Sequence, residues 1–475
     1  MRTLFALLVV LSVCPAALAD TLRWTNPAGG AWDDPANWDL ARVPSEHDEA
    51  VLDLPNAYTV AVAGDPRVGR MYIRNGGVTL SGPGTLWSGA AWGAGGVGLF
   101  IGEVGQPASL TLAGARLYHA ASFMETIRVE PGSTLRLEPG SLIYTSHSDA
   151  TIAPGASLIM TGGTFNPGWT IIHGTALVTG GLLTGELIRI EPSAHITVSG
   201  AGSVMRAQEH WTQVGGEITV LNGGEIDIYS GSGTQGVAAR FSLMDGGVVR
   251  CLAQSMDANS SVTVGPGGVW AGYGVTAFHC PVTFAAGSTG NLTGVFHTSP
   301  DIDQAATITR GFIALNQGMT VEIDGLTNPA APMVPASVQS DNTYITGPLT
   351  VRVRNPNALR VGDVIPIFGH EANDTQAFSG LIAPDIGGGR QLTLTRTGNP
   401  AVSSIAVVQG LPSCYTADFD GDGDTGTDAD IEAFFACLAG QCCPACASAD
   451  FNGDGDTGTD ADIESFFRIL AGGPC

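Results

Sequence analysis

A recurring frame of strand, turn and strand limits this chain to a few β architectures. Four segments share it: TIRVEPGSTLRLEPGSLIY from Thr126, ATIAPGASLIMTGGTF from Ala150, LIRIEPSAHITVSGAGSV from Leu187 and SVTVGPGGVWAGYG from Ser261. Apolar and polar residues alternate in each, which is typical of strands with one buried face. Proline presets φ at the turn, and a following glycine accepts the left-handed conformation. Residues 78–300 lack the apolar spacing of an amphipathic helix, so the body is predicted to be all-β.

Two all-β architectures use such strands, a sandwich and a solenoid. Sandwich strands are joined by varied loops, whereas a solenoid repeats one short unit whose turns stack. The turn EPGS recurs here as APGA, EPSA and GPGG, and TGG or NGG breaks recur at Thr161, Thr179 and Asn222. We therefore expect a parallel β-solenoid (β-helix) over 78–300, with coils of roughly 20 residues.

The segments that flank this body differ from it in composition. Residues 20–77 contain Trp24, Trp32 and Trp38. We expect these tryptophans and the first strands to cap the solenoid, because the end of a coil stack exposes strand edges. The alternative is an aromatic platform that binds sugar. Residues 301–410 have more even strands and fewer glycine repeats, and this terminal β-rich segment is either the end of the solenoid or a small sandwich.

The body resembles the passenger-type β-helical repeats of autotransporters and related bacterial surface proteins. Its opening segment, WTNPAGGAWDDPANWDLARVPSEHDEAVL, is similar to one that begins many secreted β-helical proteins of planctomycetes and allied bacteria. The resemblance implies a β-helical protein of the cell surface or the extracellular matrix.

The N-terminus and the charge balance bear on location and partners. MRTLFALLVVLSVCPAALAD joins one arginine, an apolar run and Ala-Leu-Ala, which predicts a secretory signal peptide over 1–19. No run is long enough for a transmembrane anchor, so we expect a secreted protein, extracellular or at the cell surface. The net charge is −24, and the basic residues form no cluster. Nucleic acid is therefore excluded as a partner.

The body offers little that suggests catalysis. A glycosidase needs two carboxylates about 5–10 Å apart, and a β-helical lyase needs a base beside acidic calcium ligands. Glu225 and Asp227 in GEIDIYSG are the best candidates, because they share one strand face. Their alternative is a solvated outer face. No H-E-x-x-H, G-x-S-x-G or P-loop motif occurs, so the sequence predicts no catalytic residue and favours a non-enzymatic protein.

An acidic stretch near the C-terminus occurs twice. DFDGDGDTGTDADIEAFF begins at Asp418, and DFNGDGDTGTDADIESFF begins at Asp450. Asp418, Asp420 and Asp422 stand at positions 1, 3 and 5, with Gly423 at position 6, which is the start of an EF-hand-type calcium loop. A solvated acidic turn is the alternative, but it explains neither the glycine nor the nearly identical second copy. We therefore expect two Ca²⁺ sites.

Each loop leads into a predicted amphipathic helix that begins at a capping box. Thr427-x-x-Asp430 has the pattern of that box. With Thr427 at loop position 9, Asp430 takes position 12, which leaves one extra residue and a loop of 13. Asp424, or alternatively Thr425, then supplies the backbone carbonyl of position 7. The predicted metal ligands are Asp418, Asp420, Asp422, Asp424, Asp430, Asp450, Asn452, Asp454, Asp456 and Asp462.

The two helices repeat one apolar pattern. Its spacing is i, i+3, i+4 and i+7, which places the apolar residues on one helix face. Gly440 and Gly472 follow as stop signals. The residues predicted on this face of the first helix are Ile431, Phe434, Phe435 and Leu438.

Two loop–helix motifs without entering helices resemble a type I dockerin, over about residues 414–475. This resemblance implies a small α-helical, calcium-dependent docking domain at 411–475 and a cohesin-like or other surface protein as its partner. Dockerins bind through the residues just after the ninth loop position, which here are Asp428-Ala429 and Asp460-Ala461. These acidic pairs differ from the small hydroxyl or hydrophobic residues that the family often has there.

Six cysteines lie in this C-terminal region. An even number of cysteines in an exported chain predicts disulfides, although their connectivity stays open. A Cys414–Cys475 bond that joins the ends of the domain is one hypothesis. A zinc site at Cys442-Cys443-x-x-Cys446 is an alternative use of the central cysteines.

Three functions fit the sequence. The first is a non-enzymatic surface or matrix protein held by calcium-dependent docking. The second is a polysaccharide-degrading β-helix enzyme delivered by the dockerin-like module. The third is a carbohydrate-binding adhesin that uses Trp24, Trp32 and Trp38. The last two make an extracellular polysaccharide a candidate partner.

Overall fold

The computed structural model describes residues 20–473 with several short gaps. The gaps are residues 89–97, 120–124, 146–148, 209–213, 229–231, 234–237, 252–253, 304–305, 310–311, 324–337, 340–341, 371–374, 399–400, 410–415, 445, 447 and 454. The predicted signal peptide, the predicted ligand Asp454 and the hypothetical Cys414–Cys475 bond lie outside the described residues. The chain divides into two compact units, one ending at Ser260 and one beginning at Ser261.

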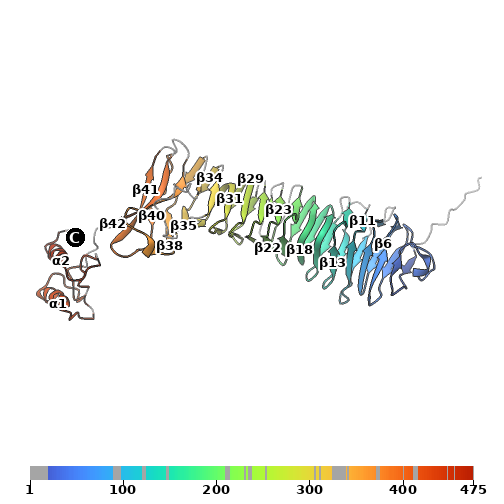
Figure 1. Cartoon of the computed structure of the whole chain (residues 1–475), viewed down its shortest axis with the longest axis horizontal. Coiled ribbons are helices and arrows are strands. Elements are labelled where there is room, and N and C mark those ends of the chain that lie inside the picture. The colour runs from blue at the N-terminus through green and yellow to red at the C-terminus, as the bar shows by residue number, and fades with distance from the viewer. Residues whose placement is uncertain are drawn as a thin grey trace, which may run out of the picture. The chain divides into compact units, whose positions relative to one another are not determined.

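The first unit is a stack of parallel β coils, which confirms the predicted solenoid (Figure 1). Eight strands form one parallel sheet: β1 (Thr21–Arg23), β3 (Glu49–Leu52), β6 (Arg70–Ile73), β9 (Leu99–Ile101), β12 (Glu125–Val129), β15 (Asp149–Ile152), β17 (Trp169–Ile172) and β19 (Leu187–Ile190). The other strands of this unit are β2 (Gly30–Ala31), β4 (Ala57–Ala61), β5 (Arg67–Val68), β7 (Gly77–Ser81), β8 (Thr85–Ser88), β10 (Ser109–Ala113), β11 (Arg116–His119), β13 (Thr134–Leu137), β14 (Leu142–Thr145), β16 (Ser157–Asn166), β18 (Thr175–Gly185), β20 (His195–Ser199), β21 (Val204–Ala207), β22 (Gly216–Leu221), β23 (Glu225–Ile228), β24 (Ser232–Gly233), β25 (Ala239–Leu243), β26 (Val248–Cys251) and β27 (Gln254–Met256).

The coils stack in register, so each inward position meets its equivalent in the next coil. Leu110 pairs with Leu135, and Leu135 pairs with Leu158. All three side chains are fully buried. Stacking therefore turns the alternation of each strand into a continuous apolar row inside the solenoid. The same row continues through Ala176, Ile196, Ile218 and Phe241.

The Pro-Gly turns adopt the conformation that their sequences predict. In the first, the Ser133 amide donates to the Glu130 carbonyl at 2.9 Å, and Gly132 has a φ of 79°. Proline at the second position and a positive φ at the third define a type II turn. The Gly132 amide also donates to the carbonyl of Gly155, at 3.0 Å, in the equivalent turn of the next coil. The turns thus stack by backbone hydrogen bonds, as the strands do.

The second unit contains parallel coils, and its last strands pair antiparallel. Its strands are β28 (Ser261–Val264), β29 (Val269–Phe278), β30 (Val282–Phe284), β31 (Thr289–Phe296), β32 (Asp301–Asp303), β33 (Thr307–Thr309), β34 (Phe312–Leu315), β35 (Met319–Ile323), β36 (Val338–Gln339), β37 (Asn342–Ile345), β38 (Leu349–Val353), β39 (Val364–Gly369), β40 (Leu381–Ile382), β41 (Arg390–Thr397) and β42 (Val402–Gln409). Strand β42 pairs antiparallel with both β39 and β41.

Strand pairing does not change at the boundaries expected from composition. In the first unit β4 pairs in parallel with β7, across residue 78. In the second unit β30 pairs in parallel with β32, across residue 301. Parallel coils therefore extend into residues 301–410, whose last strands pair antiparallel, and coils already form within 20–77.

The three N-terminal tryptophans form a buried cluster. Trp24, Trp32 and Trp38 are at most 2% exposed, and the Trp38 ring lies 5.2 Å from Trp24 and 5.0 Å from Trp32, centroid to centroid. The Trp38 indole N–H donates to the Trp32 carbonyl at 2.9 Å. A sugar platform needs an exposed ring face, so the platform interpretation of these tryptophans is wrong.

A buried histidine makes the first unit sensitive to pH. His119 ends β11 with its ring inside the solenoid, 2% exposed, and its Nδ1 shares a hydrogen bond of 3.2 Å with the Ser88 hydroxyl. Burial lowers the pKa of His119 from 6.5 to about 4. The unfolded chain therefore binds a proton at a higher pH than the folded one does.

We expect the free energy of unfolding to fall as the pH drops from about 6.5 to about 4, by up to about 3 kcal/mol from this residue alone. Below pH 4 its contribution no longer changes. Urea unfolding followed by tryptophan fluorescence at several pH values measures this slope, which His119→Asn should reduce. Equal slopes in the two proteins would contradict the prediction.

Candidate metal centre

The C-terminal region is built on two equivalent helices, α1 (Asp428–Leu438) and α2 (Asp460–Leu470). Four fully buried phenylalanines form its core, one from each loop and one from each helix. The rings of Phe434 and Phe466 stack at 4.1 Å between centroids. Phe419 and Phe451, which directly follow the first acid of each loop, pack against this pair. The core therefore fixes where each acidic loop begins relative to its helix.

The ends of both helices follow the predicted signals. The Thr427 hydroxyl accepts from the Asp430 amide, and the Asp430 carboxylate accepts from the Thr427 amide, which is a complete capping box. Thr459 and Asp462 repeat it in α2. Gly440 and Gly472 follow the helices as predicted. The apolar face, however, differs from the prediction, because Phe434 is buried but Phe435 is 45% exposed. Adjacent residues on a helix differ by about 100° in direction, so the buried face is narrower than predicted.

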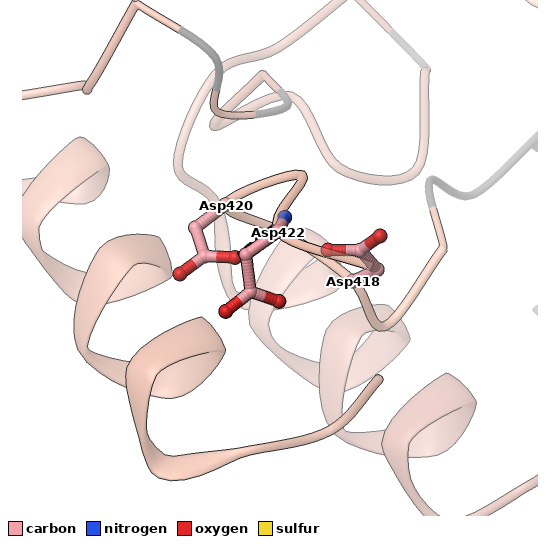
Figure 2. A group of neighbouring side chains, drawn as sticks. All are labelled: Asp418, Asp420 and Asp422. Carbon is pink, nitrogen blue, oxygen red and sulfur yellow. Dashed lines mark hydrogen bonds between the residues drawn. The ribbon is translucent and has the colours of Figure 1, made fainter. Parts of the chain in front are cut away.

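Three carboxylates of the first loop converge on one point. Asp418, Asp420 and Asp422 each offer one oxygen, and these oxygens lie within 4.8 Å of one another (Figure 2). Backbone amides hold the side chains in place: the Asp422 amide donates to Asp420 Oδ1 at 3.2 Å, and the Asp424 amide donates to Asp422 Oδ1 at 2.9 Å. Hard oxygen ligands at positions 1, 3 and 5 suit Ca²⁺.

The first aspartate of each loop has one oxygen without a partner. In loop one, the Gly423 amide donates to Asp418 Oδ2 at 3.2 Å, while Asp418 Oδ1 is buried and accepts no hydrogen bond. In loop two, the Gly455 amide donates to Asp450 Oδ2 at 3.0 Å, and Asp450 Oδ1 is likewise buried and unpaired. A buried carboxylate oxygen without a partner is costly, and a bound cation would remove this cost.

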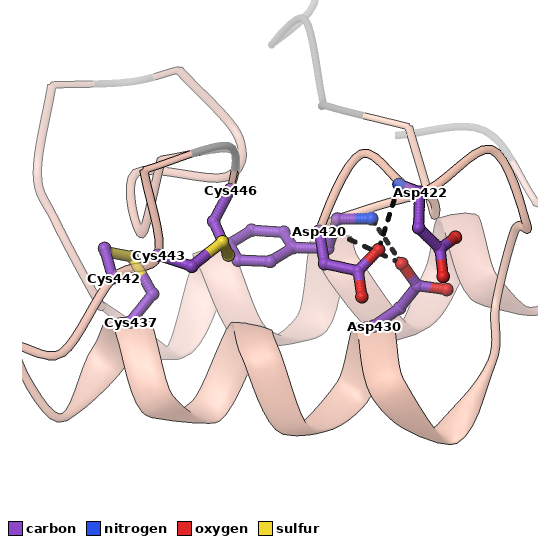
Figure 3. The surroundings of a disulfide bond; sticks show 8 residues. Asp420, Asp422, Asp430, Cys437, Cys442, Cys443 and Cys446 are labelled. Carbon is purple, nitrogen blue, oxygen red and sulfur yellow. Dashed lines mark hydrogen bonds between the residues drawn. A yellow bond between two sulfur atoms is a disulfide. The ribbon is translucent and has the colours of Figure 1, made fainter.

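Asp430 closes the first loop onto its helix (Figure 3). Its Oδ1 accepts from the Phe419 amide at 2.6 Å and from the Asp420 amide at 3.4 Å. Its Oδ2 accepts from the Thr427 amide at 2.8 Å and from the Thr427 hydroxyl at 3.0 Å. Burial raises the pKa of Asp430, but these hydrogen bonds together outweigh it and lower the pKa.

These four donors occupy the four lone-pair sites of the Asp430 carboxylate. Asp430 therefore holds both the loop and the helix cap, as its position in the sequence predicts, through hydrogen bonds from the chain. It lies outside the cluster that Asp418, Asp420 and Asp422 form. Its part as a metal ligand stays a prediction.

The second loop repeats this arrangement as far as it is described. Asp462 Oδ1 accepts from the Asn452 amide at 3.1 Å, and its Oδ2 accepts from the Thr459 amide and hydroxyl, both at 2.8 Å. Asn452 is buried, whereas Asp456 is exposed, as is Asp424 in loop one. The carbonyl ligands expected from Asp424 and Asp456 also stay predictions.

Two disulfides lie at the end of α1 and in the connection that follows it. They join Cys437 to Cys442 and Cys443 to Cys446 (Figure 3). Bonded sulfurs supply no thiolate, so the zinc alternative at Cys442, Cys443 and Cys446 is wrong. Cys446 also packs against the phenylalanine core, which fixes the connection between the two loop–helix motifs.

The strongest acidic pair of the body is part of an ion-pair network. Glu225 pairs with Arg250, and Asp227 Oδ2 pairs with Arg206 Nε at 3.3 Å. Asp227 is 3% exposed, so the alternative that it lies on a solvated outer face is wrong. Burial raises the pKa of Asp227. Arginines from the coils on both sides thus hold these acids, which suits a structural role.

Two groups of exposed aromatic residues were missed in the sequence. Phe435 and Phe467, at equivalent positions of α1 and α2, lie 6.1 Å apart between ring centroids. Trp87, Tyr118 and Tyr144 form a row on the first unit. Exact repetition at positions 435 and 467 was a usable signal for the first group. Finding the second group requires knowledge of the strand register, which the irregular coil lengths conceal in the sequence.

No family model, curated protein or solved structure matches the chain. Among the described residues, no helix has both the length and the apolar character needed to cross a membrane. The candidate site therefore stands on its own geometry.

We expect Asp430→Asn to loosen the start of α1 with or without calcium, because asparagine offers one acceptor oxygen in place of two. The expected loss is about 1–2 kcal/mol. Hydrogen exchange measured by mass spectrometry should show faster exchange at the Phe419 and Thr427 amides. Asp428→Asn, an exposed change in the same turn, is the matched control. Unchanged exchange in chelator, with only calcium affinity reduced, would show that Asp430 acts as a ligand alone.

Proposed function

We propose that this chain is a non-enzymatic extracellular protein, in which a β-solenoid is held at the cell surface or in a matrix by calcium-dependent docking of residues 411–475. The proposal gives the C-terminal duplicate two Ca²⁺ sites and assigns no catalysis to the solenoid. The partner is a cohesin-like or other surface protein. The apolar N-terminal segment 1–19 supports secretion.

The unpaired buried oxygen at the start of both loops carries the proposal. Asp418 and Asp450 each turn one oxygen to a glycine amide and keep the other buried and unpaired. A solvated acidic turn would leave both oxygens exposed to water. The same arrangement in two copies favours a cation over chance.

The charge of the domain supports coupling between calcium and folding. Residues 411–475 contain eleven aspartates and two glutamates against one arginine. Like charges so close together repel one another and weaken the compact state. Two divalent cations would offset part of this charge, so calcium binding is expected to stabilise the domain.

The exposed phenylalanine pair supports docking. Phe435 and Phe467 are 45% and 42% exposed, and they lie together on the surface of a domain with an otherwise acidic exterior. An apolar patch of this kind is typical of a protein interface. Because each phenylalanine follows a core phenylalanine, the calcium loops and the patch are linked through the same helices.

Calorimetric titration of the full, chelator-treated chain with CaCl₂ tests the metal sites. We expect two bound ions, with one lost in Asp418→Ala, one in Asp450→Ala and both in the double variant, since each removes the position-1 ligand. Asp428→Ala and Asp460→Ala remove equal charge outside the loops and should bind within about twofold of the parent. Absence of binding heat, or equal losses in the control variants, would contradict the two sites.

Retention on envelopes of the producing cells tests docking. We expect the protein to bind in calcium and to be released by chelator. Phe435→Ser together with Phe467→Ser should weaken retention about tenfold or more, as loss of a central aromatic anchor does, while calcium titration stays normal. Val104→Ser, a change at an exposed solenoid residue, is the control. Retention unaffected by the double substitution would place the interface elsewhere.

A further inference from the structure

Three aromatic side chains form a row on the outside of the first unit. Trp87 of β8 pairs in register with Tyr118 of β11, and Tyr118 pairs with Tyr144 of β14. Their ring centroids are 5.0 Å and 5.5 Å apart, and the ring planes differ by 31° and 46°. We call Trp87, Tyr118 and Tyr144 the aromatic ladder.

The ladder faces solvent. Trp87 is 36% exposed and Tyr144 39% exposed, and Tyr118 between them is half-buried, whereas their strand neighbours Leu86 and Ile143 are fully buried. The solenoid does not require aromatic residues at this outward position, because Arg67 and Asn166 occupy it in the coils on either side. Exposed aromatic side chains in consecutive coils therefore indicate a binding surface.

We propose that the aromatic ladder binds an extended, neutral, β-linked polysaccharide, with about one sugar ring over each coil. Coils repeat at about 4.8 Å along the stack. One hexopyranose advances an extended β-linked chain by nearly the same distance, so successive sugars meet successive aromatic rings.

The polar groups of the ladder suit the same ligand. Indole N–H and phenol O–H groups combine an apolar body with a polar tip, which matches a pyranose that has apolar faces and equatorial hydroxyls. Arg67 and Asn166 lie in register at the two ends of the row, beside Trp87 and Tyr144. Both side chains carry N–H donors for sugar hydroxyls, and Arg67 also pairs with Glu46 at 3.4 Å.

The charge of the chain selects against other ligands. A net charge of −24 repels nucleic acid and carboxylated or sulfated glycans, which leaves neutral polysaccharides. The three ladder residues lie in the first unit, away in sequence from the acidic loops. This inference is therefore independent of the calcium sites.

Binding of the full chain to cellulose, mannan, xylan and chitin tests the ladder. Depletion of protein from solution over insoluble polysaccharide gives the association constant. We expect binding to at least one of these glycans, with a loss of about two- to tenfold for Trp87→Thr or Tyr144→Thr, since an aromatic contact contributes about 0.5–1.5 kcal/mol. Threonine suits an outward strand position, so the variants should fold.

Matched variants make the result specific. Trp169→Thr removes a more exposed tryptophan from β17, in the other sheet, and should leave binding unchanged. Tyr118→Phe keeps the ring and should retain binding within about threefold. Binding should also persist in chelator, which separates this surface from the proposed calcium function.

Three outcomes would overturn the inference. The first is that none of the four polysaccharides binds the parent chain. The second is that Trp169→Thr weakens binding as much as Trp87→Thr does. The third is self-association in sedimentation experiments that the ladder variants abolish, because the occupant of this face would then be a second copy of the chain.

Discussion

In-register stacking of parallel coils is the constraint on which the solenoid depends. A single coil cannot bury its inward side chains, but Leu110, Leu135 and Leu158 cover one another when coils stack. The turns stack by the same rule, through backbone hydrogen bonds such as that from Gly132 to Gly155. One register thus serves both the apolar core and the backbone, and a coil that slipped by one residue would turn its core outward.

The C-terminal domain depends on a different balance. Its core is four phenylalanines, and its loops are ordered by amides that donate to carboxylates. The first turn of each helix holds this arrangement together, because Asp430 and Asp462 bind both the loop and the helix cap. Such a small core leaves the domain sensitive to the charge of its own loops.

The sequence predicted the strands, turns and helices better than it predicted which of their side chains are buried. Alternation, Pro-Gly turns, capping boxes and stop glycines are local signals, and the structure confirms the solenoid and both helices. Burial was harder to predict, because alternation does not reveal which tryptophan lies inside. Trp38 is in a buried cluster, whereas Trp87 lies outside. Phe435 was wrongly predicted to be buried, because a helix of 11 residues packed on one small core buries only part of its apolar residues.

Rows of outward-facing side chains on the solenoid differ in their chemical character. Arg206, Asp227 and Arg250 pair in register on successive coils and neutralise one another, so this row is occupied by its own ion pairs. Trp87, Tyr118 and Tyr144 occupy outward positions in the same register system, but their exposed faces have no such partner within the described residues. Trp87 and Tyr144 are 36% and 39% exposed, so part of each side chain remains open to solvent. The presence of aromatic residues at the same position of three consecutive coils is therefore better explained by a ligand that repeats at the spacing of the coils.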